Sequence, residues 1–232
     1  MNILYISHLF KKASSGPNYS VPAQIKAQSK LDNVFWLETT DTYFEFWLES
    51  GVFHNANEYK NVKIAQLPTP FNKPDLVVFE GFYFFEYIKY AKECRNLKIP
   101  YVIVPRSSLT KQGQKQKRLK KLVANFIFFN KFAKKASGIQ FLTNKELNDS
   151  GFKWNKNNFV IPNGMVKRDL INREIKDNLE GCYIGRFAIY QKGLDLLLKA
   201  CKLIKDKLIN ANISISFYGF DNQEKIQFKK DI

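Results

Sequence analysis

Short apolar runs alternate along this chain with segments of helical spacing, and this alternation limits the folds that the chain can adopt. Runs such as LVVF at 76–79 and YVIV at 101–104 are apolar without interruption, as strands buried on both faces of a sheet require. Strands that alternate with helices form βαβ units around a parallel sheet. The sequence therefore predicts an α/β protein.

The predicted elements are short strands ended by Asn, Asp, Pro or Gly, with helical segments between them. We expect strands at 2–7, 33–38, 62–67, 75–81, 101–106, 138–143, 159–162, 182–185 and 213–219. We expect helices near 20–31, 83–97, 112–135, 144–150 and 192–207.

One polar stretch, 165–179, follows the turn signal Pro162-Asn163-Gly164 and predicts a domain boundary. We expect a Rossmann-like domain with a parallel sheet at 1–164. Residues 165–232 would form a linker and the first part of a second Rossmann-like domain. Two strands and about two helices do not close a core of their own, so we expect the second domain to be incomplete.

The charge of the chain is lopsided, with 37 Lys+Arg against 21 Asp+Glu and a formal net charge of +16. This excess predicts an anionic partner, which could be nucleic acid, an acidic membrane face or a phosphorylated substrate. Lysines that only keep an aromatic-rich chain soluble are the alternative. The lysines are spread along the chain without an RNA-binding motif, so we expect no nucleic acid partner.

The cysteines and the N-terminus bear on the compartment. Each of the three cysteines lies in an apolar run without metal-ligand spacing, which favours reduced, buried thiols in a cytosolic protein. The N-terminus has no signal-peptide pattern, and no stretch reaches the ~18 uncharged apolar residues of a spanning helix. We expect a cytoplasmic protein that can associate peripherally with the inner face of the membrane.

Polar and glycine-containing segments follow several predicted strands, at 8–20, 80–81, 105–109 and 185–192. In open parallel sheets, ligands bind beyond the carboxyl ends of the strands. Arg186 follows the strand at 182–185, and Lys192 precedes a leucine-striped helix. A guanidinium forks onto two phosphate oxygens and an ammonium adds a point charge, so this pair fits a diphosphate. Two solvated surface cations are the alternative.

The sequences around these cations resemble the retaining, GT-B-fold glycosyltransferases of the family 4 type. FVIPNGM at 159–165 is similar to the family's strand-to-linker signature, and YIGRFAIYQKGLDLLLKA at 183–200 to its G-R-x(5)-K-G-x-D-x-L-L motif. The resemblance implies two Rossmann-like domains and transfer of a sugar, with retention, from a nucleotide-sugar donor. It also implies that Arg186 and Lys192 grip the donor diphosphate.

Two further segments resemble parts of the same family. The loop at 7–22 lies where the family has a Gly-Gly turn near the donor phosphates; Gly16 matches one glycine and Ser15 fills the other position. Gly16 would permit positive φ and close backbone approach.

The stretch at 102–128 resembles the subgroup that builds bacterial surface polysaccharides such as capsule or O-antigen, where the strand ends Pro-Arg-Gly-Met-Leu. Here Ser107 and Ser108 replace Gly-Met, which leaves the acceptor open. We expect Arg106, Ser107 and His8 on the acceptor side.

Several other motifs are absent from the sequence. It contains no Asp-x-Asp, no G-x-G-x-x-G and no G-x(4)-G-K-[ST], which argues against a metal-bridged donor site, a dinucleotide site and a P-loop. This agrees with what the resemblance implies, namely a metal-independent protein with no cofactor beyond the nucleotide-sugar co-substrate.

The predicted helix at 112–135 is basic and amphipathic. It carries five cations within 115–121 and an apolar face made of Leu119, Leu122, Val123, Phe126 and Ile127 together with Asn130. Such a helix can lie on an anionic membrane, at roughly 1 kcal/mol per lysine near the surface, which would suit a lipid-linked acceptor. A helix whose apolar face packs on the core, with a solvated basic side, remains equally open.

The resemblance thus implies a glycosyltransferase that moves a sugar to a growing, lipid-linked bacterial polysaccharide. In the resembled family the donor domain continues through a paired-glutamate motif, E-x(7)-E, which this chain does not reach. We therefore expect a truncated copy that is inactive alone. The alternatives are a basic membrane- or nucleic-acid-binding module and a GT-B-fold nucleotide-sugar epimerase.

Overall fold

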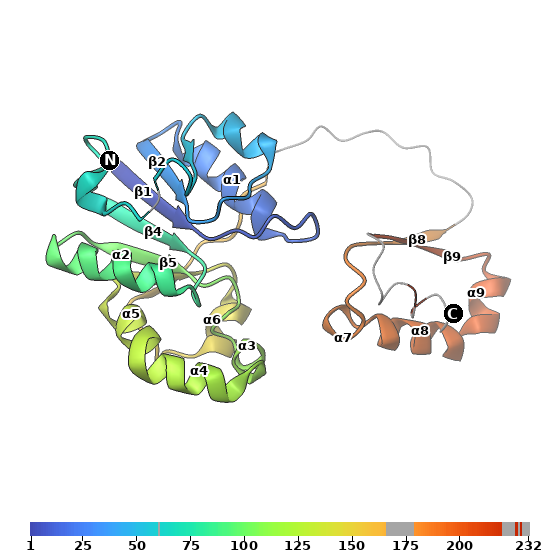
Figure 1. Ribbon diagram of the computed structural model, residues 1–232. Helices are drawn as coiled ribbons and strands as arrows, with labels where there is room; N and C mark the ends of the chain where they lie inside the picture. The colour runs from blue at the N-terminus through green and yellow to red at the C-terminus, as the bar shows by residue number, and fades with distance from the viewer. Residues whose placement is uncertain (60, 166–178, 220–225, 227, 229–232) are drawn as a thin grey trace. The chain divides into compact units, whose positions relative to one another are not determined.

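The computed structural model describes residues 1–59, 61–165 and 179–219, together with 226 and 228. The chain divides into two compact units, Met1–Val166 and Lys167–Ile232 (Figure 1). Each unit contains a parallel sheet with helices, so the predicted α/β class is confirmed.

The first unit is built on a seven-stranded sheet in which every neighbouring pair is parallel. Its order is β3-β2-β1-β4-β5-β6-β7. The strands are β1 (Asn2–Ser7), β2 (Asn33–Glu38), β3 (Phe53–His54), β4 (Leu76–Glu80), β5 (Tyr101–Val104), β6 (Gly138–Phe141) and β7 (Asn158–Val160). All carboxyl ends therefore lie along one edge of the sheet.

Helices cover both faces of this sheet, because alternate residues of each buried strand point to opposite sides. Leu4 and Ile6 of β1 belong to the core cluster that contains residues of α2 (Phe85–Asn96) and α5 (Asn130–Lys135). Ile3 and Tyr5 belong to the cluster with residues of α1 (Pro17–Gln28) and of the 3₁₀ helix η1 (Glu45–Ser50). The first unit is thus a three-layer sandwich with a core on each side.

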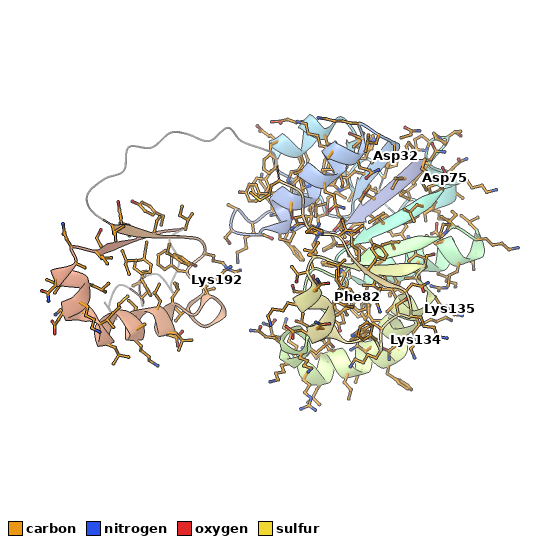
Figure 2. The ribbon with its side chains drawn as sticks, turned by 180° about the vertical axis from the view of Figure 1, so that it is seen from behind. Asp32, Asp75, Phe82, Lys134, Lys135 and Lys192 are labelled. Atoms are coloured by element: carbon orange, nitrogen blue, oxygen red, sulfur yellow. The ribbon has the colours of Figure 1, made fainter. Side chains whose placement is uncertain are left out.

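Charged groups fasten the amino edge of the sheet, opposite the carboxyl edge. The N-terminal ammonium lies 2.7 Å from a carboxylate oxygen of Asp32, and the Asn2 N–H donates to Asp75 at 2.7 Å (Figure 2). These contacts lie at the amino edge, whereas the loops that follow β1, β2, β4 and β5 lie at the carboxyl edge.

The strand predicted at 62–67 is wrong. This segment contains the 3₁₀ helix η2 (Ile64–Gln66), because its buried side chains, Ile64 and Leu67, are three residues apart rather than alternate. The Ile64 N–H donates to the Glu93 carboxylate at 2.7 Å instead of to a strand. The edge strand β3 was not predicted; it has two residues and pairs with Trp36 and Leu37.

The segment predicted as one helix at 112–135 is a series of short pieces. It contains α3 (Lys111–Lys115), α4 (Arg118–Ala124), a π-helical turn η3 (Asn125–Phe129) and α5. Lys117 adopts a left-handed backbone with φ of 53°, which breaks the helix between α3 and α4. The next helix, α6 (Asn144–Ser150), has the predicted bounds.

The second unit pairs β8 (Glu180–Ile184) in parallel with β9 (Ser214–Tyr218). The predicted helix at 192–207 consists of α7 (Ile189–Lys192), α8 (Leu194–Leu203) and α9 (Lys205–Asn210). Gly193, with φ of 67°, separates the first two. A small core forms around Phe187, Leu194 and Phe228.

Cys94 is buried, whereas Cys182 is exposed, so the expectation that all the cysteines are buried is wrong. None of the helices in the described part of the chain has the length and apolar character needed to cross a bilayer.

Candidate functional site

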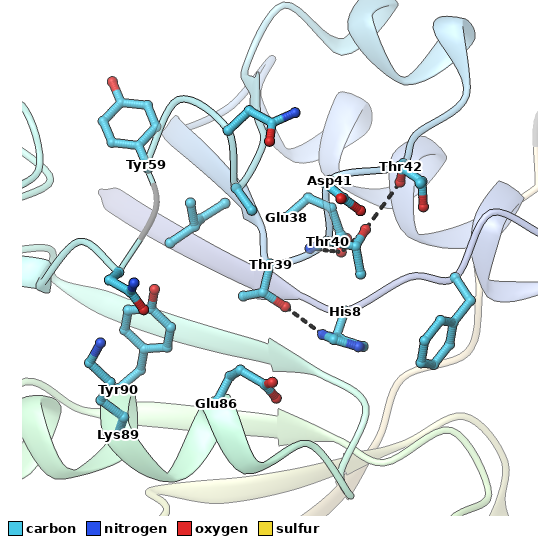
Figure 3. Close-up of a pocket in the computed structure, with 15 residues that line it drawn as sticks. His8, Glu38, Thr39, Thr40, Asp41, Thr42, Tyr59, Glu86, Lys89 and Tyr90 are labelled. Carbon is cyan, nitrogen blue, oxygen red and sulfur yellow. Dashed lines mark hydrogen bonds between the residues drawn. The ribbon is translucent and has the colours of Figure 1, made fainter.

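Two clefts open at the carboxyl edge of the first unit's sheet. The first, here called the β2 cleft, has a volume of about 550 Å³ and is lined by His8, Thr39, Asp41, Glu86 and Lys89 among others (Figure 3). The second, the Arg106 cleft, has a volume of about 270 Å³ and is lined by residues that follow β1, β4 and β5. Polar groups from distant parts of the sequence therefore meet at this edge.

His8 follows β1 and lines both clefts. The Thr39 hydroxyl donates to the Ser7 carbonyl at 3.0 Å, and its oxygen lies 2.7 Å from His8 Nδ1. Because the Thr39 proton is already engaged, Nδ1 must be the donor, and the lone pair of the imidazole is then on Nε2. Burial lowers the pKa of His8 below its usual value of 6.5, while Glu86 opposes this shift. The ring is therefore neutral at neutral pH and can accept a proton.

A buried carboxyl supports the loop that carries His8. Glu38, at the end of β2, accepts hydrogen bonds from the Ser7 hydroxyl and the Leu9 N–H, the latter at 2.9 Å. The Trp36 indole N–H donates to Ser7 Oγ at 2.7 Å. Burial raises the pKa of Glu38 to about 7, although the hydrogen bonds from Ser7, Leu9 and Thr40 act to lower this pKa.

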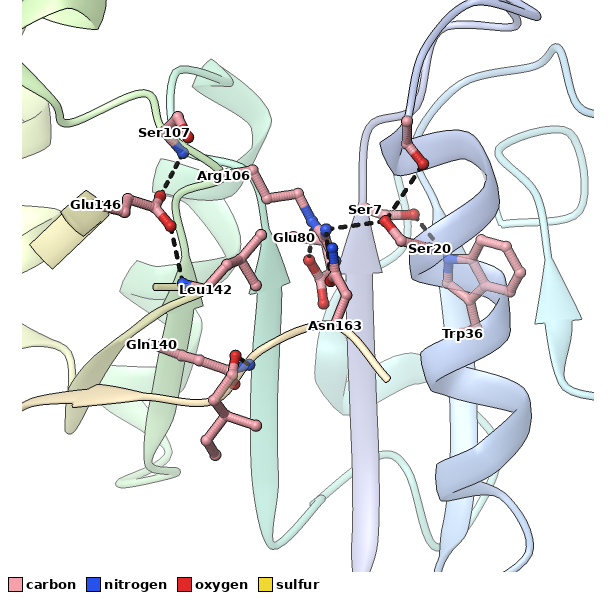
Figure 4. Close-up of polar contacts among 12 residues, drawn as sticks. Ser7, Ser20, Trp36, Glu80, Arg106, Ser107, Gln140, Leu142, Glu146 and Asn163 are labelled. Carbon is pink, nitrogen blue, oxygen red and sulfur yellow. Dashed lines mark hydrogen bonds and ion pairs between the residues drawn. The ribbon is translucent and has the colours of Figure 1, made fainter. Parts of the chain in front are cut away.

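Arg106 and Glu80 form a buried ion pair in the Arg106 cleft (Figure 4). Arg106 Nε lies 2.7 Å from Glu80 Oε2, and the exposed fractions of the two side chains are 9% and 0%. Arg106 Nη1 also donates to Ser20 Oγ at 3.1 Å and to Asn163 Oδ1 at 3.4 Å. Burial raises the pKa of Glu80, and the Arg106 cation opposes the rise.

This pair has hydrogen-bonding capacity to spare. Among the described residues, Glu80 Oε1 and Arg106 Nη2 have no hydrogen-bond partner. A buried donor or acceptor without a hydrogen-bond partner costs folding free energy. In a cleft, a polar ligand or a water molecule can supply the missing hydrogen bonds.

The loop after β5 places its two serines in different surroundings. Arg106 and Ser107 both adopt left-handed backbones, with φ of 49° and 65°. Glu146 holds this turn because its carboxylate accepts from the Ser107 N–H and, at 2.8 Å, from the Leu142 N–H (Figure 4). The Ser107 side chain is exposed, and Ser108 lines the Arg106 cleft instead.

Gly16 does not adopt the backbone expected of it. It is the residue before α1 and has φ of −55°, so positive φ is not the reason for a glycine here. A Cβ at this position would meet nothing within 4 Å. Its neighbours Ser15 and Pro17 line the Arg106 cleft. The positive end of the α1 dipole therefore faces this cleft.

Arg186 and Lys192 lie in the second unit. The Arg186 carbonyl accepts from the Tyr183 hydroxyl at 2.7 Å and from the Ala188 N–H at 2.8 Å, which fixes the turn after β8. Lys192 is exposed and is the last residue of α7, with Gly193 between it and α8 (Figure 2). It therefore ends one short helix just before the leucine-striped helix begins.

Two supporting carboxylates, Glu38 and Glu146, were missed in the sequence. Glu146 had a detectable signal, since Thr143 and Glu146 have the spacing of a helix capping box. Thr143 does cap α6, accepting from the Glu146 N–H at 3.0 Å, but the Glu146 carboxylate turns to the loop after β5. Across the described parts of both units, no group of three or more His, Cys, Asp or Glu is placed to hold a metal. Metal independence stays a prediction.

Comparison with known proteins gives structural matches only. No family model matches the chain, and no curated protein does. Anabaena HepE in complex with UDP-glucose is 13% identical, with a TM-score of 0.54 over 95% of this chain and 70% of that chain. The HepE complex with UDP is 12% identical, with a TM-score of 0.55 over 97% and 71%. UDP-GlcNAc 2-epimerase from Methanocaldococcus jannaschii is 15% identical, with a TM-score of 0.50 over 100% and 68%.

At these identities the likeness concerns the fold. The chain has a GT-B-like fold.

Proposed function

We propose that this chain is a glycosyltransferase that uses a nucleotide-sugar donor. The observation that carries the proposal is the turn after β8, where Arg186 and then Lys192 precede α8 in a fold shared with the UDP-glucose complex of HepE. This is the strand–turn–helix context that the G-R-x(5)-K-G motif requires.

In the proposed reaction, Arg186 and Lys192 bind the donor diphosphate and stabilise the charge that develops on it as the sugar leaves. Two charge-assisted contacts at about 1.5–3 kcal/mol each would supply much of a diphosphate's affinity. Such fixed cations favour the transition state because they are aimed at the developing charge.

The first unit would hold the acceptor. His8 offers the Nε2 lone pair to an acceptor hydroxyl, and the Arg106–Glu80 pair offers one donor and one acceptor atom. We propose a growing, lipid-linked bacterial polysaccharide as the acceptor, with retention at the sugar and without a metal ion. The protein would work in the cytoplasm, at the inner face of the membrane.

Donor binding tests this proposal. Calorimetric titration of the 232-residue chain with UDP, ADP, GDP and UDP-glucose should show binding of at least one nucleoside diphosphate. Arg186→Ala should weaken this affinity at least about tenfold, since 1.4 kcal/mol corresponds to a factor of ten.

The control variant Lys207→Ala removes an exposed cation from the same unit and should leave the affinity unchanged. No nucleoside diphosphate binding by the chain, or equal losses in Arg186→Ala and Lys207→Ala, would remove the donor site from the second unit. If the chain does bind a nucleoside diphosphate, transfer from labelled UDP-sugars to bacterial membrane extracts would identify the acceptor class.

A nucleotide-sugar epimerase is the second candidate, favoured by the match of the entire chain to the Methanocaldococcus jannaschii UDP-GlcNAc 2-epimerase. The two functions differ in their need for an acceptor. Proton NMR of UDP-GlcNAc with the chain and no acceptor would show a second sugar epimer if the chain is an epimerase. An unchanged spectrum, with transfer when membrane extract is added, would favour the transferase.

A further inference from the structure

Most of the large apolar side chains of α4 and the π-helical turn are exposed, Phe129 excepted. They form what we call the apolar ridge, which consists of Leu119, Leu122, Val123, Phe126 and Ile127. The exposed fractions reach 86% for Phe126 and 78% for Leu119. No residue of α4 is buried. The alternative in which this face packs on the core is therefore wrong.

The π-helical turn explains why these residues point outward. The Asn130 N–H donates to the Asn125 carbonyl, five residues earlier, so the helix contains one extra residue at this turn. Phe129 and Phe132 are buried in the core. The extra residue changes the register, so the apolar positions before Phe129 no longer continue the stripe that packs on the sheet.

The ridge is surrounded by positive charge. No Asp or Glu occurs between Glu93 and Glu146. Exposed cations lie before, within and after the ridge, at Lys117, Arg118, Lys120, Lys131, Lys134 and Lys135. Lys134 and Lys135 are labelled in Figure 2. Apolar side chains beside cations, in a stretch of sequence without an acidic residue, fit a partner that presents both hydrocarbon and negative charge.

A cleft beside the ridge extends the apolar surface. It has a volume of about 750 Å³ and is lined by Leu122, Val123, Phe126 and Ile127, with Trp154, Lys134 and Lys153 also in its wall. The Lys153 ammonium lies 5.2 Å from the Trp154 ring. Aliphatic side chains outnumber aromatic ones on the ridge, which favours lipid over single-stranded nucleic acid, because nucleic acid bases stack on aromatic rings.

We propose that the apolar ridge and its cations form a docking surface for an anionic membrane. The ridge enters the boundary between headgroups and acyl chains, as the apolar face of an interfacial helix does. The cations contact lipid phosphates. This proposal stands whether the chain is a transferase or an epimerase.

The docking surface is tied to the Arg106 cleft by a short polar chain. Asn125, the first residue of the π-helical turn, contacts the Tyr83 hydroxyl through its Oδ1 at 3.0 Å. Gln114 Nε2 lies 2.8 Å from the same hydroxyl and donates to the Ser108 carbonyl at 2.8 Å. Ser108 lines the cleft. A lipid-linked acceptor held at the membrane would thus lie near the proposed acceptor side. This last step rests on the proposed function.

Vesicle sedimentation tests the docking surface with the full chain. We expect the chain to bind vesicles of phosphatidylcholine mixed with an equal amount of phosphatidylglycerol, and not vesicles of phosphatidylcholine alone. Two variants remove the two contributions separately: Leu122→Ser with Phe126→Ser, and Gln at Arg118, Lys120, Lys131 and Lys134. Each should lower the partition coefficient at least about tenfold, since each cation near the surface contributes about fivefold and each large apolar side chain taken out of water about tenfold or more.

Matched controls change equally exposed residues elsewhere. Leu31→Ser with Leu203→Ser removes two exposed leucines, and Gln at Lys30, Lys73, Lys205 and Lys207 removes four exposed cations. Both should bind vesicles as the unchanged chain does. Equal losses in test and control variants, or no binding to anionic vesicles, would overturn the proposal. Self-association that depends on Phe126, without vesicle binding, would assign the ridge to a second copy of this chain instead.

Discussion

Replacing Arg106 by Met removes the cation that faces Glu80 inside the first unit. The two side chains are 9% and 0% exposed and 2.7 Å apart, so the substitution leaves the buried Glu80 carboxylate without its charged partner. Removing one partner of a buried pair costs about 3–5 kcal/mol. This is a large part of the roughly 5–15 kcal/mol by which domains are stable. We expect Arg106→Met to lower the free energy of unfolding by this amount.

The double variant, Glu80→Leu with Arg106→Met, tests whether the loss of stability comes from the unpaired Glu80 carboxylate. With both charges absent, no carboxylate is left unpaired, and the stability should return to within about 1–2 kcal/mol of the unchanged chain. The exposed Lys145–Asp149 pair, 3.1 Å apart, is the matched control. Lys145→Met should cost less than about 1 kcal/mol, as exposed pairs do.

The loss in Arg106→Met should also depend on pH. Burial already raises the pKa of Glu80, and Arg106 opposes this rise, so removing the cation raises the pKa further. A carboxyl with a raised folded-state pKa loses stability as pH rises above its unfolded value. The cost should therefore be small near the ordinary carboxyl pKa of 4.5 and grow towards neutral pH.

Urea unfolding followed by tryptophan fluorescence measures these changes. Trp36, Trp47 and Trp154 are the three tryptophans of the chain and all lie in the first unit, so the signal reports the unfolding of that unit. Linear extrapolation gives the free energy in water. A loss below about 1 kcal/mol in Arg106→Met at neutral pH, or a double variant as unstable as the single one, would refute the assignment of a strongly coupled buried pair.

Three further predictions follow from single positions. Glu38→Gln should flatten the fall in stability between pH 4.5 and about 7, which comes from the raised pKa of Glu38 and amounts to about 3 kcal/mol; an unchanged pH profile in urea unfolding would contradict it. Ser107→Gly should raise the unfolding free energy by about 0.5–1 kcal/mol, because φ of 65° strains a residue with a Cβ; a lower midpoint would show that the Ser107 side chain contributes. Gly219→Ala should weaken nucleoside diphosphate binding as Arg186→Ala does, because its Cβ would lie 2.1 Å from the carbonyl oxygen of Gly185, the residue before Arg186. Gly164→Ala, whose Cβ would meet nothing within 4 Å, is the control.

The strands were predictable where burial on both faces leaves an uninterrupted apolar run. Strands β1 and β2 have the predicted bounds, and the loops expected at strand ends meet at one edge, which brings His8 and Arg106 to the same cleft. The short strand β3 was not predictable, because two residues give no period. The outward face of α4 was not predictable either, because the extra residue of the π-helical turn leaves no mark in the apolar spacing.

The placement of polar groups in the site was less accessible to sequence reasoning. The Glu38 carboxylate ends a strand, but only the fold brings the Leu9 N–H to it. Ser107 was predicted on the acceptor side, and its side chain is exposed on a left-handed backbone. Backbone conformation at one residue thus decides which of two adjacent serines lines the cleft.

His8 is part of the wall of two clefts. It lines both the β2 cleft of about 550 Å³ and the Arg106 cleft of about 270 Å³, and its ring is wedged between Phe84 at 4.5 Å and Phe10 at 4.9 Å. Phe10 also lines both clefts, so two neighbouring rings occupy the stretch of the edge that the clefts share. Exchange of His8 for a small residue would remove one of these two rings, so the free volume along this edge of the sheet depends on the size of one side chain.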